Sequence, residues 1–499
     1  MKYFVIALVF ILFSCSTNKE YSVSDDSLSE KKELQIKFHD NKYAEGELIN
    51  RQLDGYRGIW YMNQPLDNKY KYKYSGGLAT YTAKHNPFAI YREEVNKTFF
   101  TYGGTDQENS TLLHMVSYYD HQTGKVSKPT LVLDKKTTDA HDNPVMAIDE
   151  DGYIYIFSTS HGTSRPSYIS KSKVPYDISA FEKIEATKIE EGERVPMTNF
   201  SYMQSWYQPG RGFVNFFTRY GYPADRTICF MTSPDGESWS EWKRIAAIKK
   251  GHYQISALGD GVAGSAFNFH PDTEEKRGLN WRTNLYYVES RDFGENWQAA
   301  DGTPLELPLT DIENPSLVHD YYSKDLNVYM KDITYDRQGR PVIMYITSEG
   351  YESGPDNDPR TWRTARWDGE EWIIRDITTS DNNYDMGSLF IEEDGTWRII
   401  APTETGPQSY NPGGEVAMWL SEDQGQSWSK ERQLTRGSDF NHTYVRRPIN
   451  AHPDFYGFWA DGHGRQPSKS NLYFSNKEGE VFQLPEHMEQ EMEEPLRVE

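Results

Sequence analysis

Cysteine is nearly absent from this chain, with only Cys15 and Cys229 among 499 residues. A disulfide framework or a cysteine-rich zinc site therefore cannot be built. Positive charge is also scarce, since 53 Lys and Arg stand against 75 Asp and Glu, for a formal net charge of −22. This balance argues against a nucleic-acid partner. If the ligand is itself acidic, the cationic groups that bind it must be gathered at one place.

Helix signals and interdomain linkers are lacking too. The apolar stretches are short, β-branched and aromatic, and 37 Gly and 25 Pro recur throughout the chain. No Ser/Gly/Pro-rich segment divides it. Cys229 lies in one of the apolar stretches, residues 227–231, where we expect it to be a buried small hydrophobic side chain. These features favour a single all-β domain.

The first residues have the features of a secretion signal. Lys2 precedes an apolar run over residues 4–13, which is too short to span a membrane as a mature helix. Ser14 before Cys15 resembles a bacterial lipobox, in which the cysteine carries the lipid. We therefore expect a signal peptide over residues 1–15 and a flexible tether over 16–44. The protein would be secreted or at the cell surface, as an outer-membrane lipoprotein of a bacterium that meets the membrane only through its lipid anchor.

An eight-residue phrase, Ser-x-Asp-x-Gly-x-x-Trp, returns three times, starting at Ser233 (one residue short), Ser290 and Ser421. Each copy follows an apolar, aromatic run that is typical of a strand. In this Asp-box pattern the Asp side chain caps backbone N–H groups of a turn, the Gly takes a backbone angle that other residues resist, and the Trp fills the gap between strands. The phrase therefore marks a repeated β-hairpin rather than an active site.

The spacing of the Asp boxes predicts the architecture. The interval between the second and third copies fits two units, and a degenerate unit is visible between them around Asp336 and Gly339. Similar Asp-Gly hairpins occur at Gly152 and Gly395. Roughly 440 residues in units of roughly 60 give about seven repeats. We therefore predict a seven-bladed β-propeller over residues 45–485, followed by an acidic tail over 486–499, with a β-helix as the alternative.

Three segments place unusual polar groups beside strands. His141 precedes the strand predicted over 145–148, and His161 follows the strand predicted over 153–157, so the two histidines bracket one hairpin. In the third segment, Tyr202 precedes and Arg219 follows an aromatic strand. Two histidines, a tyrosine and an arginine suit proton abstraction beside a carboxylate. One histidine would be the base, Tyr202 the acid or a second base, and Arg219 the group that neutralises the carboxylate.

The same chain carries a series of short motifs that resembles a known family. These are Gly76–Tyr81, His85-Asn86-Pro87, His141–Pro144, Ser160-His161-Gly162, Phe217–Tyr220, Phe267–Pro271 and the Asp boxes. Over residues 56–461 they resemble the BNR-repeat ulvan lyases of polysaccharide lyase family 25, related to family 24. The resemblance implies a seven-bladed propeller that cleaves ulvan, a sulfated algal polysaccharide of rhamnose 3-sulfate and uronic acid, by β-elimination.

The resemblance also implies roles for individual residues. The catalytic positions of the family fall on His141, His161, Tyr202 and Arg219, and its substrate-side positions on Tyr253 and Arg165, with Tyr207 an alternative to the catalytic tyrosine. No cofactor is required. Some relatives hold a structural metal ion, which leaves a site at His270 open, although no cysteine stands nearby.

Two other function classes remain open at this point. A propeller α-L-rhamnosidase would use His85 on the opposite face, and a surface propeller would bind glycans without cleaving them. A conventional glycosidase with two catalytic carboxylates lacks a spacing that singles out a pair.

Overall fold

Strands dominate the computed structural model, which describes residues 45–78, 85–105, 111–162, 165–197, 200–221, 224–271 and 278–498. All of these belong to one compact unit, Phe38–Glu499. The predicted signal peptide, Cys15 and the tether lie outside the described residues. They remain predictions. Lipidation of Cys15 predicts that a Cys15→Ala variant loses its association with membranes, and unchanged association would contradict it.

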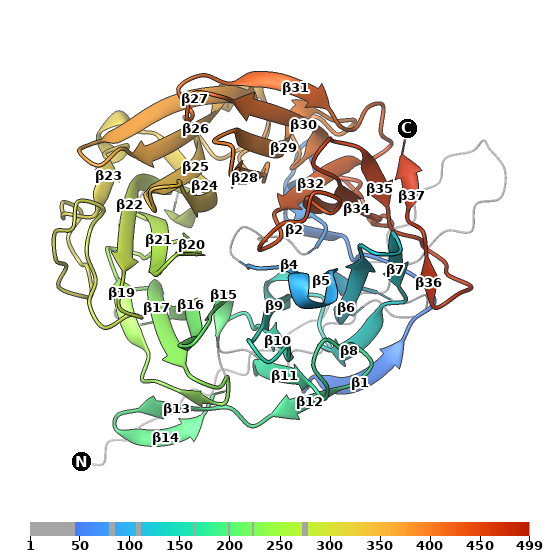
Figure 1. Ribbon diagram of the computed structural model, residues 1–499. Helices are drawn as coiled ribbons and strands as arrows, with labels where there is room; N and C mark the ends of the chain where they lie inside the picture. The colour runs from blue at the N-terminus through green and yellow to red at the C-terminus, as the bar shows by residue number, and fades with distance from the viewer. Residues whose placement is uncertain are drawn as a thin grey trace, which may run out of the picture. The chain divides into compact units, whose positions relative to one another are not determined.

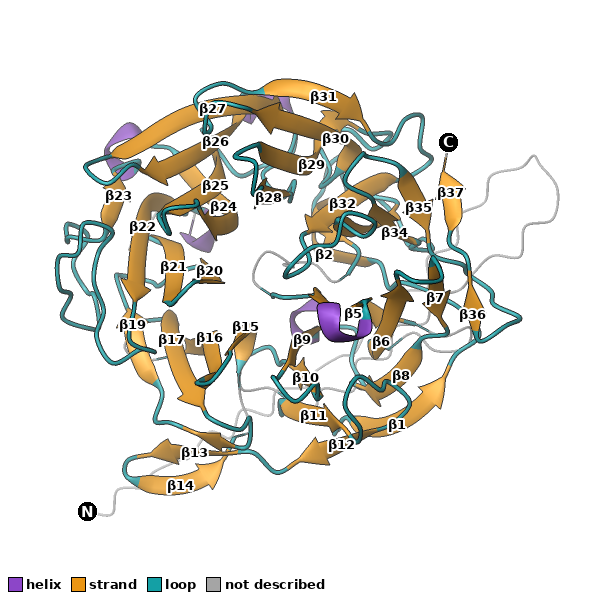
Figure 2. Cartoon of the chain, viewed as in Figure 1, coloured by secondary structure: helices purple, strands orange, loops and turns teal. Residues whose placement is uncertain are grey.

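Helix occurs in the described residues only as short 3-10 turns, and Figure 2 shows strands and loops making up nearly all of the rest. The turns are η2 (Glu93–Val95), η3 (Ala140–Asp142), η4 (Gly278–Asn280), η5 (Tyr322–Lys324) and η6 (Pro355–Asn357). Within this part of the chain, no helix is long and apolar enough to cross a membrane.

Four sheets each contain four antiparallel strands that neighbour one another in chain order. One consists of β9 (Pro144–Ile148), β10 (Ile154–Ser158), β11 (Tyr168–Ser172) and β12 (Phe181–Ile184). The next consists of β15 (Ser201–Gln208), β16 (Gly212–Tyr220), β17 (Arg226–Ser233) and β19 (Lys243–Ala246). The third consists of β20 (Gln254–Gly259), β21 (Val262–Phe269), β22 (Thr283–Ser290) and β23 (Leu317–His319). The fourth consists of β24 (Asn327–Tyr335), β25 (Pro341–Ser348), β26 (Arg360–Trp367) and β27 (Trp372–Ser380).

Two larger sheets hold the first and last strands. The first sheet has β1 (Glu47–Gln52), β4 (Ala89–Arg92), β5 (Lys97–Gly104), β6 (Leu113–Asp120), β7 (Lys125–Ser127), β8 (Thr130–Asp134) and β36 (Met492–Glu493). The last begins with β28 (Ser388–Ile391), β29 (Trp397–Thr405), β30 (Gly414–Ser421) and β31 (Ser429–Gln433). It continues with β32 (Asn441–Arg446), β33 (Gly457–Gly462), β34 (Leu472–Ser475), β35 (Val481–Gln483) and β37 (Leu496–Val498). A single bridge, Gly414 to His442, joins these two groups of strands.

Small sheets complete the unit: β2 (Tyr61–Pro65) pairs with β3 (Tyr72–Gly76), and β13 (Thr187–Glu190) pairs with β14 (Glu193–Pro196) and with β18 (Ser238–Trp239). Beyond residue 485, where an acidic tail is predicted, β36 pairs with β7 and β37 with β35. This segment therefore packs on the first and last sheets.

The main sheets follow one another around a common centre, with β20 and β24 near the middle and β23 and β27 outside (Figure 1). Neighbouring sheets touch in chain order, since β9 contacts β5 and β15, and β20 contacts β15 and β24. The first and last sheets share one apolar core, in which the ring of Phe100 stacks on that of Phe455. Burial of such aromatic side chains supplies much of the free energy that holds sheets together.

The Asp boxes form the turns that their sequence predicts. In the first box, Asp235 Oδ1 accepts hydrogen bonds from the backbone N–H groups of Glu237 and Ser238 at 2.9 and 2.7 Å. Gly236 has φ 78°, and Trp239 is buried and donates its ring N–H to the Gly236 carbonyl. The other two boxes repeat the cap. The prediction of an all-β fold is confirmed, and so is that of a buried Cys229.

Candidate active site

The two histidines predicted from the sequence lie side by side. His141 belongs to η3, just before β9, and His161 follows β10, and the pairing of Pro144 with Ser158 brings both to the same end of this hairpin. Their rings stack with centroids 3.8 Å apart. Asp139 joins them, since His141 Nδ1 lies 2.5 Å from one carboxylate oxygen and His161 Nδ1 lies 2.8 Å from the other. The two histidines that bracket one hairpin in the sequence thus lie at one end of that hairpin.

Arg165 holds this carboxylate in place. Its guanidinium donates to Asp139 at 2.7 Å and to both oxygens of Asp142 at 2.7 and 2.9 Å. Arg165 is buried, and Lys135 Nζ lies 3.7 Å from Asp142 on the same side. The two-point pairing fixes the Asp142 carboxylate geometrically. Arg165, predicted to bind substrate, is therefore engaged by Asp142 and makes one hydrogen bond that holds Asp139.

The protonation of the cluster follows from burial and hydrogen bonds. Burial lowers the pKa of His141, and the Asp139 carboxylate opposes this only in part, so the imidazole is neutral near pH 7. Burial would raise the pKa of Asp139, yet the two histidines hold it well below its usual value. With Nδ1–H donated to the ionised carboxylate, Nε2 is the unprotonated nitrogen of His141. This arrangement provides a base and no carboxylic acid.

Tyr202 lies against this pair. Its ring is edge-on to His141 at 5.6 Å and edge-on to Tyr253 at 5.7 Å. The side chain is turned into the cluster by an irregularity in the pairing of β15 with β16 between Ser201 and Gln204, where Tyr202 has φ 50°. Such left-handed backbone is strained for a tyrosine and is found where a bulge redirects a side chain. Burial raises the pKa of Tyr202 well above 10, so its hydroxyl is protonated.

Two predicted residues do not join the cluster. The guanidinium of Arg219 lies over the ring of Trp242 at 4.5 Å. Because side chains alternate along a strand, its neighbour Tyr220 points to the opposite face, toward Tyr202 at 6.4 Å. Tyr207 packs on Phe213 near the end of β15 away from Tyr202. Arg219 as the neutralising group and Tyr207 as a substrate-side residue therefore lack support from the geometry.

Other cations stand where Arg219 is expected. Arg226, the first residue of β17, lies over the rings of Tyr220 at 5.5 Å and Tyr253 at 5.3 Å. Arg282 directly precedes β22, lies over Tyr253 at 4.3 Å and donates to the Tyr384 hydroxyl at 3.1 Å. Neither is predicted from the sequence. Tyr220 pairs with Arg226 across the β16–β17 hairpin, so Arg226 lies on the same face of the sheet as Tyr220 and Tyr202. This pairing is the one feature of the local sequence from which the position of Arg226 follows.

Positive charge gathers around these two arginines. Burial lowers the pKa of Lys73 to about 7, and the charges of Arg282 and Arg226 add to the effect. Burial and the same two charges lower the pKa of His270. In a chain of net charge −22, an acidic ligand can bind only where cations are gathered at one place. The two arginines and Lys73 form such a place.

His85 belongs to the same cluster. Its Nε2 lies 3.2 Å from the His141 carbonyl and 3.2 Å from the Thr159 hydroxyl, and its ring is 5.7 Å from that of Tyr202. The sequence hypothesis that His85 marks an active site on the opposite face is therefore wrong. The local sequence gives no means of placing it, since a parallel bridge between the distant residues Asn86 and Gln204 brings His85 and Tyr202 together.

In and beside this cluster, two places in the described residues carry residue types that bind metals. Asp139, His141 and His161 have suitable ligand atoms within 4.8 Å of one another, but both Nδ1 atoms already face the Asp139 carboxylate. At His270, Nδ1 lies 2.9 Å from the Trp281 carbonyl, and the nearby charges of Arg282 and Arg226 add to burial in lowering its pKa. Two adjacent guanidinium groups disfavour a cation, so a metal at His270 stays a prediction without geometric support.

The amino-acid sequence is similar to those of two curated ulvan lyases. An ulvan lyase from Alteromonas sp. (strain LOR) is 21% identical over 436 residues, which cover 79% of this chain and 84% of the relative. Ulvan Lyase-PL25 from Pseudoalteromonas sp. (strain PLSV) is 21% identical over 442 residues, covering 79% and 83%. The resemblance to BNR-repeat ulvan lyases predicted from the motifs is confirmed by these matches.

The solved structure of a PL25 ulvan lyase bound to -[GlcA(1-4)Rha3S]- superposes with a TM-score of 0.65 at 18% identity, covering 86% of this chain and 96% of that chain. At this identity, the likeness shows a shared fold. The BNR repeat-containing family matches residues 97–380, which is more than half of the sequence. The chain therefore belongs to the BNR repeat-containing family.

Proposed function

We propose that this protein is a polysaccharide lyase that cleaves ulvan by β-elimination at a 4-linked uronic acid next to sulfated rhamnose. The observation that carries the proposal is the placing of a neutral, carboxylate-oriented histidine beside a protonated tyrosine and two arginines. Both sequence relatives above are named ulvan lyases. Elimination needs a base, a proton donor and a group that offsets carboxylate charge, and these residue types can supply all three.

The chemistry assigns one task to each group. The C5 proton of a uronate is weakly acidic, so a cation must offset the charge that develops on the C6 carboxylate as the proton leaves. His141 Nε2 removes that proton, with Asp139 stabilising the imidazolium that forms. The Tyr202 hydroxyl donates a proton to the departing O4. His161, the more exposed histidine, shares the carboxylate and supports the same site.

The scaffold in this proposal is a seven-bladed propeller. Four blades are the four-stranded sheets, one is formed by β4, β5, β6 and β8, and the largest sheet supplies two, which meet at the single bridge between β30 and β32. The core shared by Phe100 and Phe455 would close the ring. An experimental structure with a different number of blades would contradict this count.

We assign the neutralising role to Arg226 rather than Arg219. Arg226→Gln should lower kcat/KM on ulvan by about 10²–10³-fold, the usual cost of removing one preorganised stabilising group. Arg219→Gln is the matched control, since it removes the same charge from the opposite face of the sheet and should leave activity nearly unchanged. Both variants should keep the wild-type melting temperature. A larger loss in Arg219→Gln would return the role to Arg219.

The pH dependence follows from the lowered pKa of His141. A base works only when unprotonated, so kcat/KM should be full at pH 7 and fall with acid through a midpoint below 6.5, the ordinary histidine value. In Asp139→Asn the charge that raises the His141 pKa is lost, and the midpoint should move further down while the rate decreases. A wild-type midpoint above 6.5 would contradict the assignment of His141 as the base.

The competing function is glycan binding without cleavage. A binding surface has no use for an oriented base, and the raised Tyr202 pKa and lowered His141 pKa are typical of catalytic groups.

A glycosidase with two carboxylates needs one that is protonated, whereas Asp139 is held ionised by the histidines. Incubation with ulvan separates these functions, because only elimination produces a conjugated, ultraviolet-absorbing uronate.

A further inference from the structure

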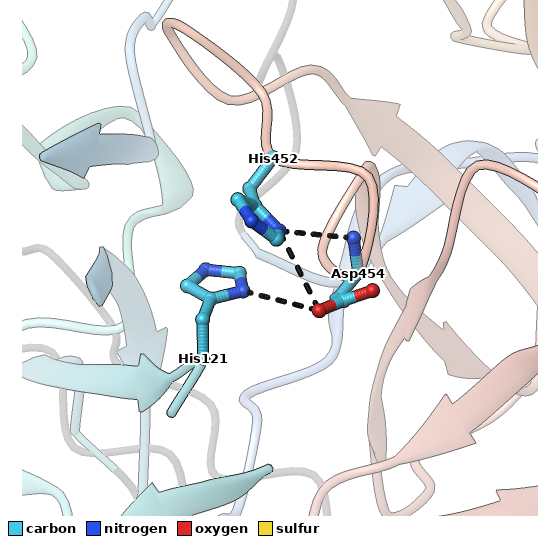
Figure 3. Close-up of side chains that lie close together, drawn as sticks. All are labelled: His121, His452 and Asp454. Carbon is cyan, nitrogen blue, oxygen red and sulfur yellow. Dashed lines mark hydrogen bonds and ion pairs between the residues drawn. The ribbon is translucent and has the colours of Figure 1, made fainter. Parts of the chain in front are cut away.

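A second cluster of metal-binding side chains lies where the first and last sheets meet. His121 directly follows β6, whereas His452 and Asp454 lie in the connection between β32 and β33 (Figure 3). One Asp454 carboxylate oxygen lies 3.8 Å from His121 Nδ1 and 3.6 Å from His452 Nδ1. The three side chains point toward one another, and each offers a ligand atom within 4.8 Å of the others.

His121 has one satisfied and one unsatisfied nitrogen. Its Nε2 lies 2.8 Å from the Thr98 hydroxyl, while Nδ1 is buried and makes no hydrogen bond with any described residue. The side chain is only 1% exposed, so water does not substitute. If Nε2–H donates to Thr98, the lone pair of Nδ1 faces Asp454. Metal-binding histidines are commonly oriented by such a bond from the other ring nitrogen, and a buried nitrogen without a partner calls for a ligand.

The distances from the Asp454 carboxylate oxygen to the two histidine nitrogens suit binding of a shared metal ion better than direct hydrogen bonds. At 3.6 and 3.8 Å, the nitrogen–oxygen distances are too long for hydrogen bonds. Ligand atoms held about 2.0–2.2 Å from a tetrahedral zinc ion lie about 3.4 Å apart. The backbone N–H of Asp454 donates to His452 Nδ1 at 3.2 Å, which marks that nitrogen as unprotonated. A metal ion at Nδ1 would displace this long hydrogen bond, because the nitrogen has a single lone pair.

The surroundings hold the two histidines in place. The ring of Tyr91 packs on His121 at 5.2 Å and on His452 at 4.9 Å. The Tyr91 N–H also donates to the Ile449 carbonyl at 3.0 Å, which ties the chain before His452 to β4. A site whose ligands are positioned before the ion arrives loses little conformational entropy on binding. The Asp454 side chain is 56% exposed, which leaves an open side for water as a further ligand.

We propose that His121, His452 and Asp454 bind a divalent transition-metal ion that links the first sheet to the last. Two imidazoles and one carboxylate favour zinc or a similar ion over calcium or magnesium. The ligands come from chain segments far apart in sequence, at the seam where the shared core of Phe100 and Phe455 brings the two sheets together. Unfolding must separate these segments, so the ion stabilises the folded state.

Zinc binding to the untagged full chain tests the proposal. After treatment with chelator, Zn²⁺ should raise the wild-type melting temperature by about 2 °C or more. His452→Ala and Asp454→Asn change side chains that are half-buried or exposed, so both variants should fold. Each variant should bind one zinc ion fewer per chain than the wild type, and zinc should no longer raise its melting temperature. His487→Ala, an exposed histidine outside the cluster, is the control and should behave as wild type.

These measurements do not depend on lyase activity. Zinc bound only at the Asp139 cluster would leave the stoichiometry and shift of His452→Ala and Asp454→Asn equal to those of the wild type. That result, or a wild-type chain without any zinc-dependent shift, would overturn the proposal.

Discussion

Replacing His141 with alanine should lower the rate of unsaturated uronate formation on ulvan by about 10²–10⁴-fold, the range that a positioned general base supplies. The expectation rests on three features of this side chain. Its Nδ1 is held by the Asp139 carboxylate at 2.5 Å, burial lowers its pKa so that the imidazole is neutral, and it touches Tyr202. The rate is followed by ultraviolet absorbance, and calorimetry with ulvan oligosaccharides should show that binding is kept.

His161→Ala is the matched control for this variant. His161 binds the same carboxylate but is 37% exposed, so its loss should reduce activity less and leave the orientation of His141 intact. If His161→Ala silences the enzyme while His141→Ala retains most of its rate, the two histidines exchange roles. His85→Ala cannot distinguish a rhamnosidase from a lyase, because His85 contacts the same site as His141 and Tyr202.

Tyr202→Phe should cost a similar factor, about 10²–10⁴ in turnover, because it removes the proton donor for the leaving O4. Its raised pKa means that the hydroxyl carries its proton at neutral pH, and the bulge in β15 directs it at the histidines. Ring packing is preserved in phenylalanine, so the melting temperature should change little. Single-turnover kinetics on ulvan measure the chemical step directly.

Tyr207→Phe removes the same hydroxyl from the other end of β15 and serves as the control. It should keep near-normal turnover, since its ring packs on Phe213 away from the histidines. Near-normal turnover in Tyr202→Phe, together with a severe loss in Tyr207→Phe, would show that the catalytic tyrosine had been assigned to the wrong position.

Features set by local sequence could be predicted. The Asp-box turn depends on residues within eight positions of one another, and the structure forms it with Asp235 capping backbone N–H groups and Trp239 buried behind them. The meeting of His141 with His161 depends on one hairpin, whose pairing brings both to the same end. In each case the information lies in a short segment with a strong backbone preference.

Features set by distant contacts or by the face of a strand could not be predicted. Arg219 and Tyr220 are adjacent, and only strand pairing decides which of them points toward Tyr202, because a shift of one residue reverses the two faces. Arg282 reaches Tyr253 from two strands away in the same sheet, and no spacing in the sequence signals that contact. Arg165 has the residue type of a substrate-binding group, but the carboxylates of the buried Asp142 and the partly buried Asp139 engage it.

The most direct test of the account is digestion of ulvan by the purified full chain, with ultraviolet absorbance and new reducing ends measured together. Elimination forms one conjugated C4–C5 double bond for each chain break, so the account predicts that absorbance rises in proportion to reducing ends and that both vanish in His141→Ala. New reducing ends without absorbance would show hydrolysis and contradict the proposed lyase.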